Sequence, residues 1–394
     1  MHYAFDDCLL DLKRRELRKG GQPVELEPQV FDLLVFLLRH RDRVVSRDDL
    51  IEGVWGGRIV SESALASRVN AVRRAVGDDG TAQRLVKTII RKGFRFVGDV
   101  RETADADSAV AAAKTLAQSI TFCRTSDGVG IAMASVGQGP PLVKTANWLN
   151  HLEADWQSPV WSPMLHRLAG RFRLIRYDGR GCGLSDREVA ETSQAGFERD
   201  LDAVVEATKL DRFALLGMSQ GVASAVAYAS RHPERVSRLI LYGGYAQGRN
   251  RRGSSMDAAS SQAMLAMMQQ GWGNPDSAFM RAFSSIYLSD TSRIYLNWFA
   301  DMQRLSSSSN MAARLRVACD NIDIMDILPT VNVPTLVIHA RKDNVSPLEQ
   351  GRLLAATIPG ARFVTLDSEN HIPVSDDPTW TQLMDEIETF AAAG

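Results

Sequence analysis

The sequence predicts two domains of different class: a small α+β domain at the N-terminus, and a larger α/β domain with a doubly wound, mostly parallel sheet. Three observations support this prediction. The chain has 394 residues, more than one domain of typical size needs. Short alternating segments and three amphipathic patterns fill the first hundred residues. From residue 119 onward, buried strand patterns alternate with helical ones, and one strand runs into Gly-x-Ser-x-Gly at residues 217–221.

The first hundred residues are expected to form a small antiparallel sheet, three helices and a hairpin. Alternating segments at 3–5, 8–12, 15–17 and 24–26 predict the sheet. Pro28 opens the first helix, Ser46 caps the second, and Ser61 or Ser63 caps the third. The hairpin covers residues 86–97 and turns near Gly93. Each helix has one apolar face, formed in order by Phe31, Leu34, Val35 and Leu38, by Leu50, Ile51, Val54 and Trp55, and by Leu65, Val69, Val72 and Val76.

Five short motifs carry a resemblance to a known family. They are LEPQVFDLL at 26–34, VVSRDDL at 44–50, VWG at 54–56, VRRAV at 72–76 and GFRF at 93–96. Together they resemble the OmpR/PhoB-type winged helix-turn-helix domain over nearly all of residues 1–99. The resemblance implies that residues 1–100 form a DNA-binding domain and that double-stranded DNA is a partner.

The third helix is then the candidate recognition helix. With its apolar stripe buried, helical geometry places Ser63, Ser67, Asn70, Ala71 and Arg74 on the opposite side, where they would enter the major groove. Arg68 and Arg73 lie on the flanks, and either could hold a phosphate or a carboxylate within the domain. On the wing, Arg91, Lys92 and Arg95 suit contacts with the DNA backbone or minor groove. The alternative for all these residues is a solvated basic face.

Charge is only mildly asymmetric along the chain. Residues 1–100 contain 18 basic and 15 acidic residues, and the remainder contains 28 and 32. This modest excess predicts weak, salt-sensitive DNA binding by one copy, so useful affinity should require a homodimer. Residues 101–118 are small and polar, and we interpret them as a linker with a helical tendency in its Ala-rich half.

Three residues of the second domain suggest nucleophilic catalysis. Ser219 lies at a sharp turn between a buried strand at 213–218 and a helix of small residues. Asp343 follows a second buried strand at 333–339, and His371 follows a third at 361–366. The order Ser, acid, His, each after the carboxyl end of a strand, resembles the α/β-hydrolase superfamily over residues 119–394. The resemblance implies that Ser219 is the nucleophile, His371 the base and Asp343 the carboxylate that orients the imidazole.

The oxyanion loop departs from the family pattern. Many relatives have His-Gly where this chain has Ala146 and Asn147, followed by Trp148. Asn tolerates the positive φ that Gly supplies. If the loop keeps its shape, the resemblance implies an oxyanion hole formed by the backbone N–H groups of Trp148 and Gln220. If it does not, binding could persist with turnover lost.

Two further segments match the superfamily. Asp178 and Arg180 lie in a D-x-R-G-x-G-x-S turn and are expected to hold that loop in place. Residues 246–325 interrupt the strand-helix alternation where such folds carry a lid. Eight of the 13 Met residues and several aromatic residues lie there or at its end, which favours a largely apolar ligand.

Composition excludes several other classes. No apolar run is long enough to span a bilayer, and the first residues do not resemble a secretory signal. Cys8, Cys123, Cys182 and Cys319 have neither disulfide nor metal spacing, so we expect free thiols and a cytoplasmic location. No phosphate-binding Gly loop or metal motif is present, so no cofactor and no metal are expected. Serine at the turn excludes the dehalogenase and epoxide-hydrolase chemistries, which place Asp there.

Three functions fit these features. The chain could be a one-component transcriptional regulator whose hydrolase domain binds, and could hydrolyse, a small, largely apolar effector. It could instead be a serine hydrolase of esters or lactones. A third reading is an interaction module with an inactive pocket. Fusion to a complete DNA-binding domain favours regulation, whereas the complete triad favours hydrolysis.

Overall fold

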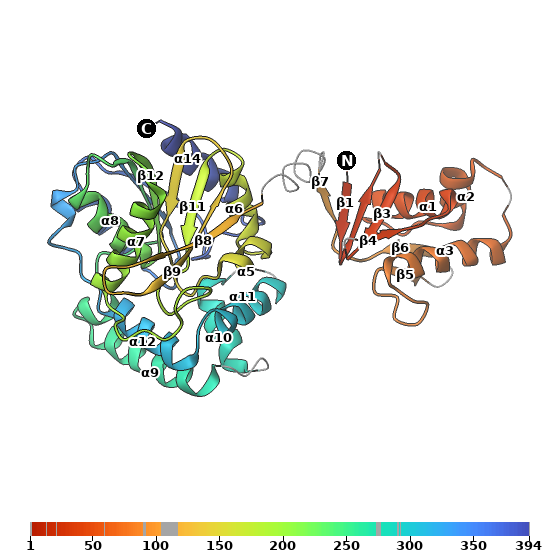
Figure 1. Cartoon of the computed structure of the whole chain (residues 1–394). Helices are drawn as coiled ribbons and strands as arrows, with labels where there is room; N and C mark the ends of the chain where they lie inside the picture. The colour runs from red at the N-terminus through yellow and green to blue at the C-terminus, as the bar shows by residue number, and fades with distance from the viewer. Residues whose placement is uncertain are drawn as a thin grey trace. The chain divides into compact units, whose positions relative to one another are not determined.

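The computed structural model describes residues 2–12, 14–20, 22–58, 60–89, 92–103, 117–272, 277–289, 291 and 293–393. It divides the chain into two compact units, Met1–Thr115 and Leu116–Gly394. We call them the N-terminal domain and the C-terminal domain (Figure 1).

The N-terminal domain begins with an antiparallel sheet. Its strands are β1 (His2–Phe5), β2 (Cys8–Asp11), β3 (Glu16–Lys19), β4 (Gln22–Val24) and β7 (Arg101–Thr103), in the order β4-β3-β2-β1-β7. Residues 101–103, expected to belong to the linker, pair instead with β1. A three-residue polar strand has no apolar alternation, so only its pairing partner reveals it.

Three helices pack beside this sheet: α1 (Pro28–Arg39), α2 (Arg47–Trp55) and α3 (Glu62–Val76). Ser46 and Asp49 form a capping box at the start of α2. Ser61, not Ser63, caps α3, because its side chain accepts the N–H of Ala64. The three predicted apolar stripes meet the sheet in one core, in which Leu34, Leu50 and Val72 are fully buried.

The predicted hairpin is present as β5 (Val86–Ile89) and β6 (Gly93–Phe96). Gly93 has φ of 136°, and a Cβ built there would lie 2.0 Å from the carbonyl oxygen of Val45. The backbones of Val45 and Phe94 exchange two hydrogen bonds at this close approach. Glycine therefore lets the hairpin dock on the segment before α2.

The C-terminal domain is built on an eight-stranded sheet of order β15-β14-β13-β12-β10-β11-β9-β8. Strands β8 and β9 form an antiparallel hairpin, β9 is antiparallel to β11, and all other neighbours are parallel. The strands are β8 (Ser119–Arg124), β9 (Gly130–Val136), β10 (Pro141–Lys144), β11 (Arg173–Tyr177), β12 (Phe213–Met218), β13 (Val236–Tyr242), β14 (Thr335–Ala340) and β15 (Arg362–Leu366).

Helices cover both faces of this sheet. One hydrophobic core joins the sheet to α6 (Ser162–Ala169) and α14 (Trp380–Ala392), and another joins it to α7 (Gln194–Thr208), α8 (Gly221–Arg231) and α13 (Leu348–Thr357). Figure 1 shows α7 and α8 on the opposite side of the strands from α14. The short helix α5 (Leu152–Gln157) follows β10. This arrangement brings the carboxyl ends of the parallel strands to one edge.

Between β13 and β14 the chain leaves the sheet and forms a helical lid. It contains the one-turn helix η1 (Arg249–Arg251), then α9 (Ser255–Gly271), α10 (Ala278–Tyr287), α11 (Arg293–Ser306) and α12 (Ser309–Asp320), and a second one-turn helix, η2 (Leu328–Thr330), leads back to β14. Within the described part of the chain, no helix is both long and apolar enough to cross a bilayer.

Candidate active site and DNA interface

The exposed side of α3 carries most of the predicted DNA-reading residues. Ser63, Ser67, Asn70 and Arg74 are exposed, and the helical repeat places them along one line. Ala71 lies beside that line but is half-buried against the core. The structure therefore presents hydroxyl, amide and guanidinium groups together on one helix face.

Arg73 does not belong to that face, and its assignment as a DNA contact is corrected. Arg73 is only 5% exposed, and its guanidinium donates hydrogen bonds to the carbonyl oxygen of Val86 and to Thr88 Oγ1. These bonds join α3 to β5. Arg68, the other flanking residue, forms an ion pair with Glu27. It holds a carboxylate within the domain, one of its two predicted roles.

Two of the three basic residues predicted on the wing lie within the described part of the chain. Lys92 and Arg95 are exposed, and Arg95 Nε donates to the carbonyl oxygen of Arg41 at 3.2 Å. Arg91 lies outside the described residues. The exposed basic side chains on β6 and its turn remain compatible with contacts to a DNA backbone.

In the C-terminal domain, the turn after β12 has the strained geometry that its motif predicts. Ser219 has φ of 52°, unusual for a residue with a side chain. A Cβ at Gly221 would lie 2.3 Å from Thr145 Oγ1, and one at Gly217 would lie 2.9 Å from Ala225 Cβ. The two glycines therefore let β12 turn directly into α8, and this turn presents Ser219 at the edge of the sheet.

Ser219, His371 and Asp343 come from three separate loops and form one hydrogen-bonded series. Ser219 Oγ lies 2.9 Å from His371 Nε2, and His371 Nδ1 lies 2.7 Å from Asp343 Oδ2. With its proton on Nδ1, the imidazole donates to the carboxylate and accepts the serine proton at Nε2. This is the geometry that nucleophilic catalysis by serine requires.

Asp343 is held as a carboxylate although it is buried. Its Oδ1 accepts the N–H groups of Val345 and Ser346 at 2.8 and 2.9 Å. Burial would raise the pKa of Asp343, but the imidazoles of His371 and His339 and the N–H of Ser346 together outweigh burial, and the pKa is lowered. A second imidazole, which no sequence motif indicates, lies nearby: His339 is buried 3.8 Å from Asp343 and contacts the carbonyl oxygen of Ser346.

The loop after β10 has its positive φ angle at a different residue from the one expected. The positive φ falls at Leu149, 42°, and not at Asn147. Instead, the Asn147 side chain accepts a hydrogen bond from the buried ammonium of Lys144, which holds the loop from below. Among the described residues, the backbone N–H groups of Trp148 and Gln220 donate to no other protein group, and both residues line the space around Ser219. These N–H groups are thus available to an oxyanion.

The turn that contains Asp178 and Arg180 is held by buried polar contacts. Asp178 accepts hydrogen bonds from Asn150 Nδ2 at 2.7 Å and from the backbone of Leu184 at 2.8 Å. Arg180 donates to Asp200 at 2.9 Å. Both side chains are fully buried and support the loop, as the sequence predicts.

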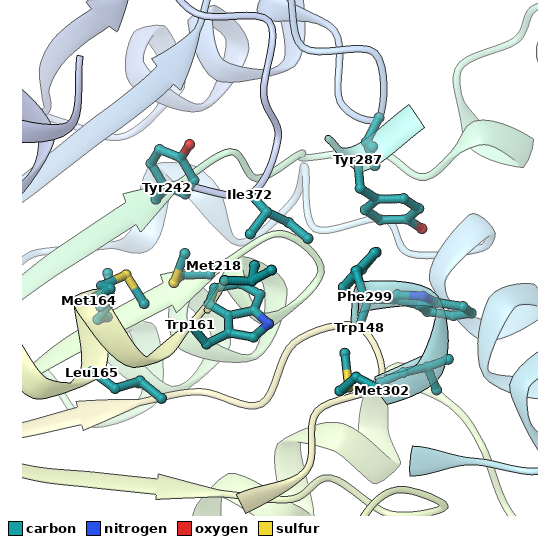
Figure 2. Close-up of a cluster of buried hydrophobic side chains, with 14 of the residues drawn as sticks. Trp148, Trp161, Met164, Leu165, Met218, Tyr242, Tyr287, Phe299, Met302 and Ile372 are labelled. Carbon is teal, nitrogen blue, oxygen red and sulfur yellow. The ribbon is translucent and has the colours of Figure 1, made fainter. Parts of the chain in front are cut away.

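A small aromatic cavity lies on one side of Ser219. Trp148, Trp161, Tyr287 and Phe299 line it, together with Met218 and Ile372 (Figure 2). Tyr287 and Phe299 come from the lid. None of the lid methionines among the described residues lines this cavity, and several of them, including Met268 and Met311, are fully buried in the core. The aromatic part of the predicted lining is present, and methionine packs the lid.

The lid also contacts the triad directly. The backbone N–H groups of His371 and Ile372 donate to the carbonyl oxygen of Tyr287, at the end of α10, at 3.0 and 3.2 Å. On the other side of the cavity, Trp148 Nε1 donates to Gln303 of α11 at 2.9 Å. A movement of the lid would therefore disturb both the base and the oxyanion loop.

Within the described ranges, no three His, Cys, Asp or Glu side chains lie close enough together to hold a metal ion. The groups that the C-terminal domain brings together beside the cavity are a serine, an imidazole, a carboxylate and backbone N–H donors.

Fold and sites together define a DNA-binding domain of the transcription-regulator class joined to a hydrolase-type domain. The chain belongs to the α/β hydrolase fold family, whose model matches residues 146–378, more than half of its length. The family described as transcriptional regulatory protein, C terminal, matches residues 21–96. These matches confirm both predicted resemblances.

Individual relatives match one domain each. The AB hydrolase superfamily protein YisY of Bacillus subtilis is 26% identical over 253 residues, which cover 64% of this chain and 91% of YisY. The transcriptional regulatory protein YkoG of the same organism is 32% identical over 95 residues, 24% of this chain and 42% of YkoG.

Solved structures also resemble the C-terminal domain. A hydrolase from Pseudomonas aeruginosa has a TM-score of 0.56 at 25% sequence identity. The match covers 70% of this chain and 97% of the hydrolase chain. An enol-lactonase from Burkholderia xenovorans has a TM-score of 0.55 at 22% identity, covering 69% of this chain and all of its own, a likeness of fold alone.

Proposed function

We propose that the protein is a cytoplasmic one-component transcriptional regulator whose C-terminal domain binds a small-molecule effector and whose N-terminal domain binds DNA as a homodimer. One observation carries the proposal: a single chain joins a regulator's DNA-binding domain to a cavity beside a hydrogen-bonded Ser219, His371 and Asp343. A DNA-binding domain has no use on a hydrolase that acts only on metabolites. A hydrolase cavity on a regulator provides a ready effector site.

Hydrolysis of the effector is the second candidate function, and the triad distances favour it. In this mechanism Ser219 Oγ attacks an ester or lactone carbonyl while His371 Nε2 takes the serine proton. The N–H groups of Trp148 and Gln220 stabilise the oxyanion. His371 then protonates the leaving alcohol, and a water activated by the same imidazole cleaves the acyl-serine bond. An effector consumed in this way would end its own signal.

A DNA-binding assay tests the regulatory proposal. The full-length protein is expected to retard DNA from upstream of its own gene, and Asn70→Ala with Arg74→Ala is expected to weaken that retardation. If the wild-type protein shifts no such DNA over a range of salt concentrations, the regulatory proposal fails.

A fluorophosphonate probe tests the serine chemistry separately. It is expected to label the wild-type protein and not Ser219→Ala, because only an activated serine reacts. Ser285→Ala, which removes an exposed lid hydroxyl that contacts only the carbonyl oxygen of Ala282, is the matched control and should label normally. An unlabelled wild-type protein would make the domain a receptor without turnover.

A further inference from the structure

Ser219 has a second cavity beside it, and this one is cationic. It shares Trp148, Ser219 and Tyr287 with the aromatic cavity. Its remaining lining includes three arginines: Arg249 and Arg252, just after β13, and Arg316 of α12. The space around the nucleophile therefore has an aromatic lobe and an arginine lobe.

Among the residues that the structure describes, Arg316 alone of these arginines forms an ion pair. Arg316 makes two contacts of 3.0 and 2.9 Å with Asp320, which also accepts a hydrogen bond from Ser261. This carboxylate is therefore neutralised in place. Asp320, and Asp257 in the case of Arg252, act on the other two arginines only from beyond ion-pair distance.

Arg249 and Arg252 have only neutral partners in direct contact. Arg249 donates to the sulfur of Met264 at 3.5 Å and, in a long contact of 3.4 Å, to the carbonyl oxygen of Val345. Arg252 donates to the carbonyl oxygen of Gln247 and lies 5.8 Å from the ring of Tyr245. Among the described residues, no carboxylate lies within ion-pair distance of either one.

Electrostatics within the lobe agree with this geometry. Burial, and then the positive charge of Arg316, lower the pKa of Arg249. A half-buried guanidinium with a like charge as its neighbour is stabilised when an anion enters, because the anion replaces lost hydration and supplies the missing counter-charge.

We propose that the arginine lobe binds an anionic group of the effector, so that the ligand of this site is an ester or lactone that also bears a carboxylate. This deepens the proposed function and rests on it, since the reacting carbonyl lies at Ser219. The carboxylate would face Arg249 and Arg252 while an apolar or aromatic portion fills the lobe lined by Trp161 and Phe299. The prediction of a largely apolar effector is thereby narrowed to an amphiphilic one.

Three arylboronic acids test the proposal, because boron bonds reversibly to an activated serine oxygen. Phenylboronic acid probes Ser219 and the aromatic lobe, whereas the 3-carboxyphenyl and 3-carbamoylphenyl compounds differ in charge at nearly equal size. Binding is followed by quenching of tryptophan fluorescence, since Trp148 and Trp161 line the cavity. We expect the wild-type protein to prefer the carboxylate over the amide by about tenfold, the scale of one hydrogen-bonded ion pair.

Matched variants locate the effect. Arg249→Gln and Arg252→Gln should each reduce the preference while leaving phenylboronic acid binding and the thermal midpoint unchanged. Arg251→Gln is the control, because this exposed neighbour on η1 lies outside the cavity and contacts Asn321. Equal affinity for carboxylate and amide, with phenylboronic acid still bound, overturns the inference and leaves the proposed function intact.

The two ideas fail separately. If neither phenylboronic acid nor the fluorophosphonate reacts at Ser219, the serine chemistry fails, and the arginine lobe is then tested by protection of Arg249 from phenylglyoxal. Protection by 3-phenylpropionate and not by its amide supports an anion site. Equal modification with and without the carboxylate overturns it.

Discussion

Arg73 and Arg74 are neighbours on α3 and have opposite surroundings. Arg74 is exposed on the line that contains Ser67 and Asn70, while Arg73 is buried and donates to the backbone of β5. Arg74 is available to contact DNA, and Arg73 holds the hairpin to the helix. We therefore assign Arg74 a contribution to DNA binding and Arg73 a contribution to the stability of the domain.

We therefore expect Arg74→Ala to weaken DNA binding by about 1–3 kcal/mol without lowering stability, if Arg74 reads a base. Arg73→Ala should instead destabilise the N-terminal domain by about 2–3 kcal/mol, because the carbonyl oxygen of Val86 loses its charged donors. Fluorescence anisotropy on labelled DNA measures the first effect, and chemical denaturation measures the second. Equal stability losses in the two variants would contradict the assignment.

Asp343 offers a second single-residue test. Asp343→Asn keeps the shape of the side chain but favours the wrong imidazole tautomer, so the rate of fluorophosphonate labelling should fall by about 10³–10⁴. Asp323→Asn changes an exposed carboxylate of the lid and should label at the wild-type rate. Labelling of Asp343→Asn within tenfold of wild type would exclude the orienting role.

The connection from α3 to β5 depends on one buried carboxylate. Asp78 accepts the backbone N–H groups of Asp79, Arg84, Leu85 and Val86 at 2.8–2.9 Å. Burial would raise the pKa of Asp78, but these four donors outweigh it and the pKa is lowered. The charged form is thus favoured by folding.

The sign of the pH effect follows from this shift. A lowered folded-state pKa contributes stability that is fully present above the unfolded value of about 4 and is lost as pH falls through the folded value. We expect hydrogen exchange in residues 78–96 to accelerate, relative to an unfolded reference peptide, as pH drops from 5 to 3. Asp78→Asn should destabilise the domain by about 2 kcal/mol at pH 7 and flatten this dependence. If the Asp78→Asn variant kept the wild-type pH profile of hydrogen exchange, the assigned role of Asp78 would be contradicted.

Several elements could be predicted from the sequence because local chemistry specifies them. Pro28, Ser46 and the glycines around Ser219 set the start of a helix, a cap and a turn within a few residues. Strand β7 could not be predicted in this way, since it is recognised by its pairing with β1, about a hundred residues earlier. The positive φ at Leu149 was missed for the same reason, because Lys144 and the lid determine the shape of that loop.

For the whole chain, regulation requires that effector and DNA binding be linked. Because linkage is reciprocal, 3-carboxyphenylboronic acid should change the affinity of the full-length protein for DNA by about 5–150-fold, and DNA should change the affinity for the ligand by the same factor. Anisotropy titrations with and without the ligand measure this factor, and Ser219→Ala should abolish it. A ligand that binds without altering DNA affinity would show two independent domains.

The two domain classes, the recognition helix and the order of Ser219, Asp343 and His371 follow from the sequence alone, because periodicity, caps and turn residues act over short distances. The environment of each side chain depends on the tertiary structure. Packing buries Arg73 and exposes Arg74, and it gathers Arg249, Arg252 and Arg316 beside a serine at least thirty residues away from each. Burial and counter-charge belong to the folded arrangement, and they decide that the candidate effector site has a cationic lobe.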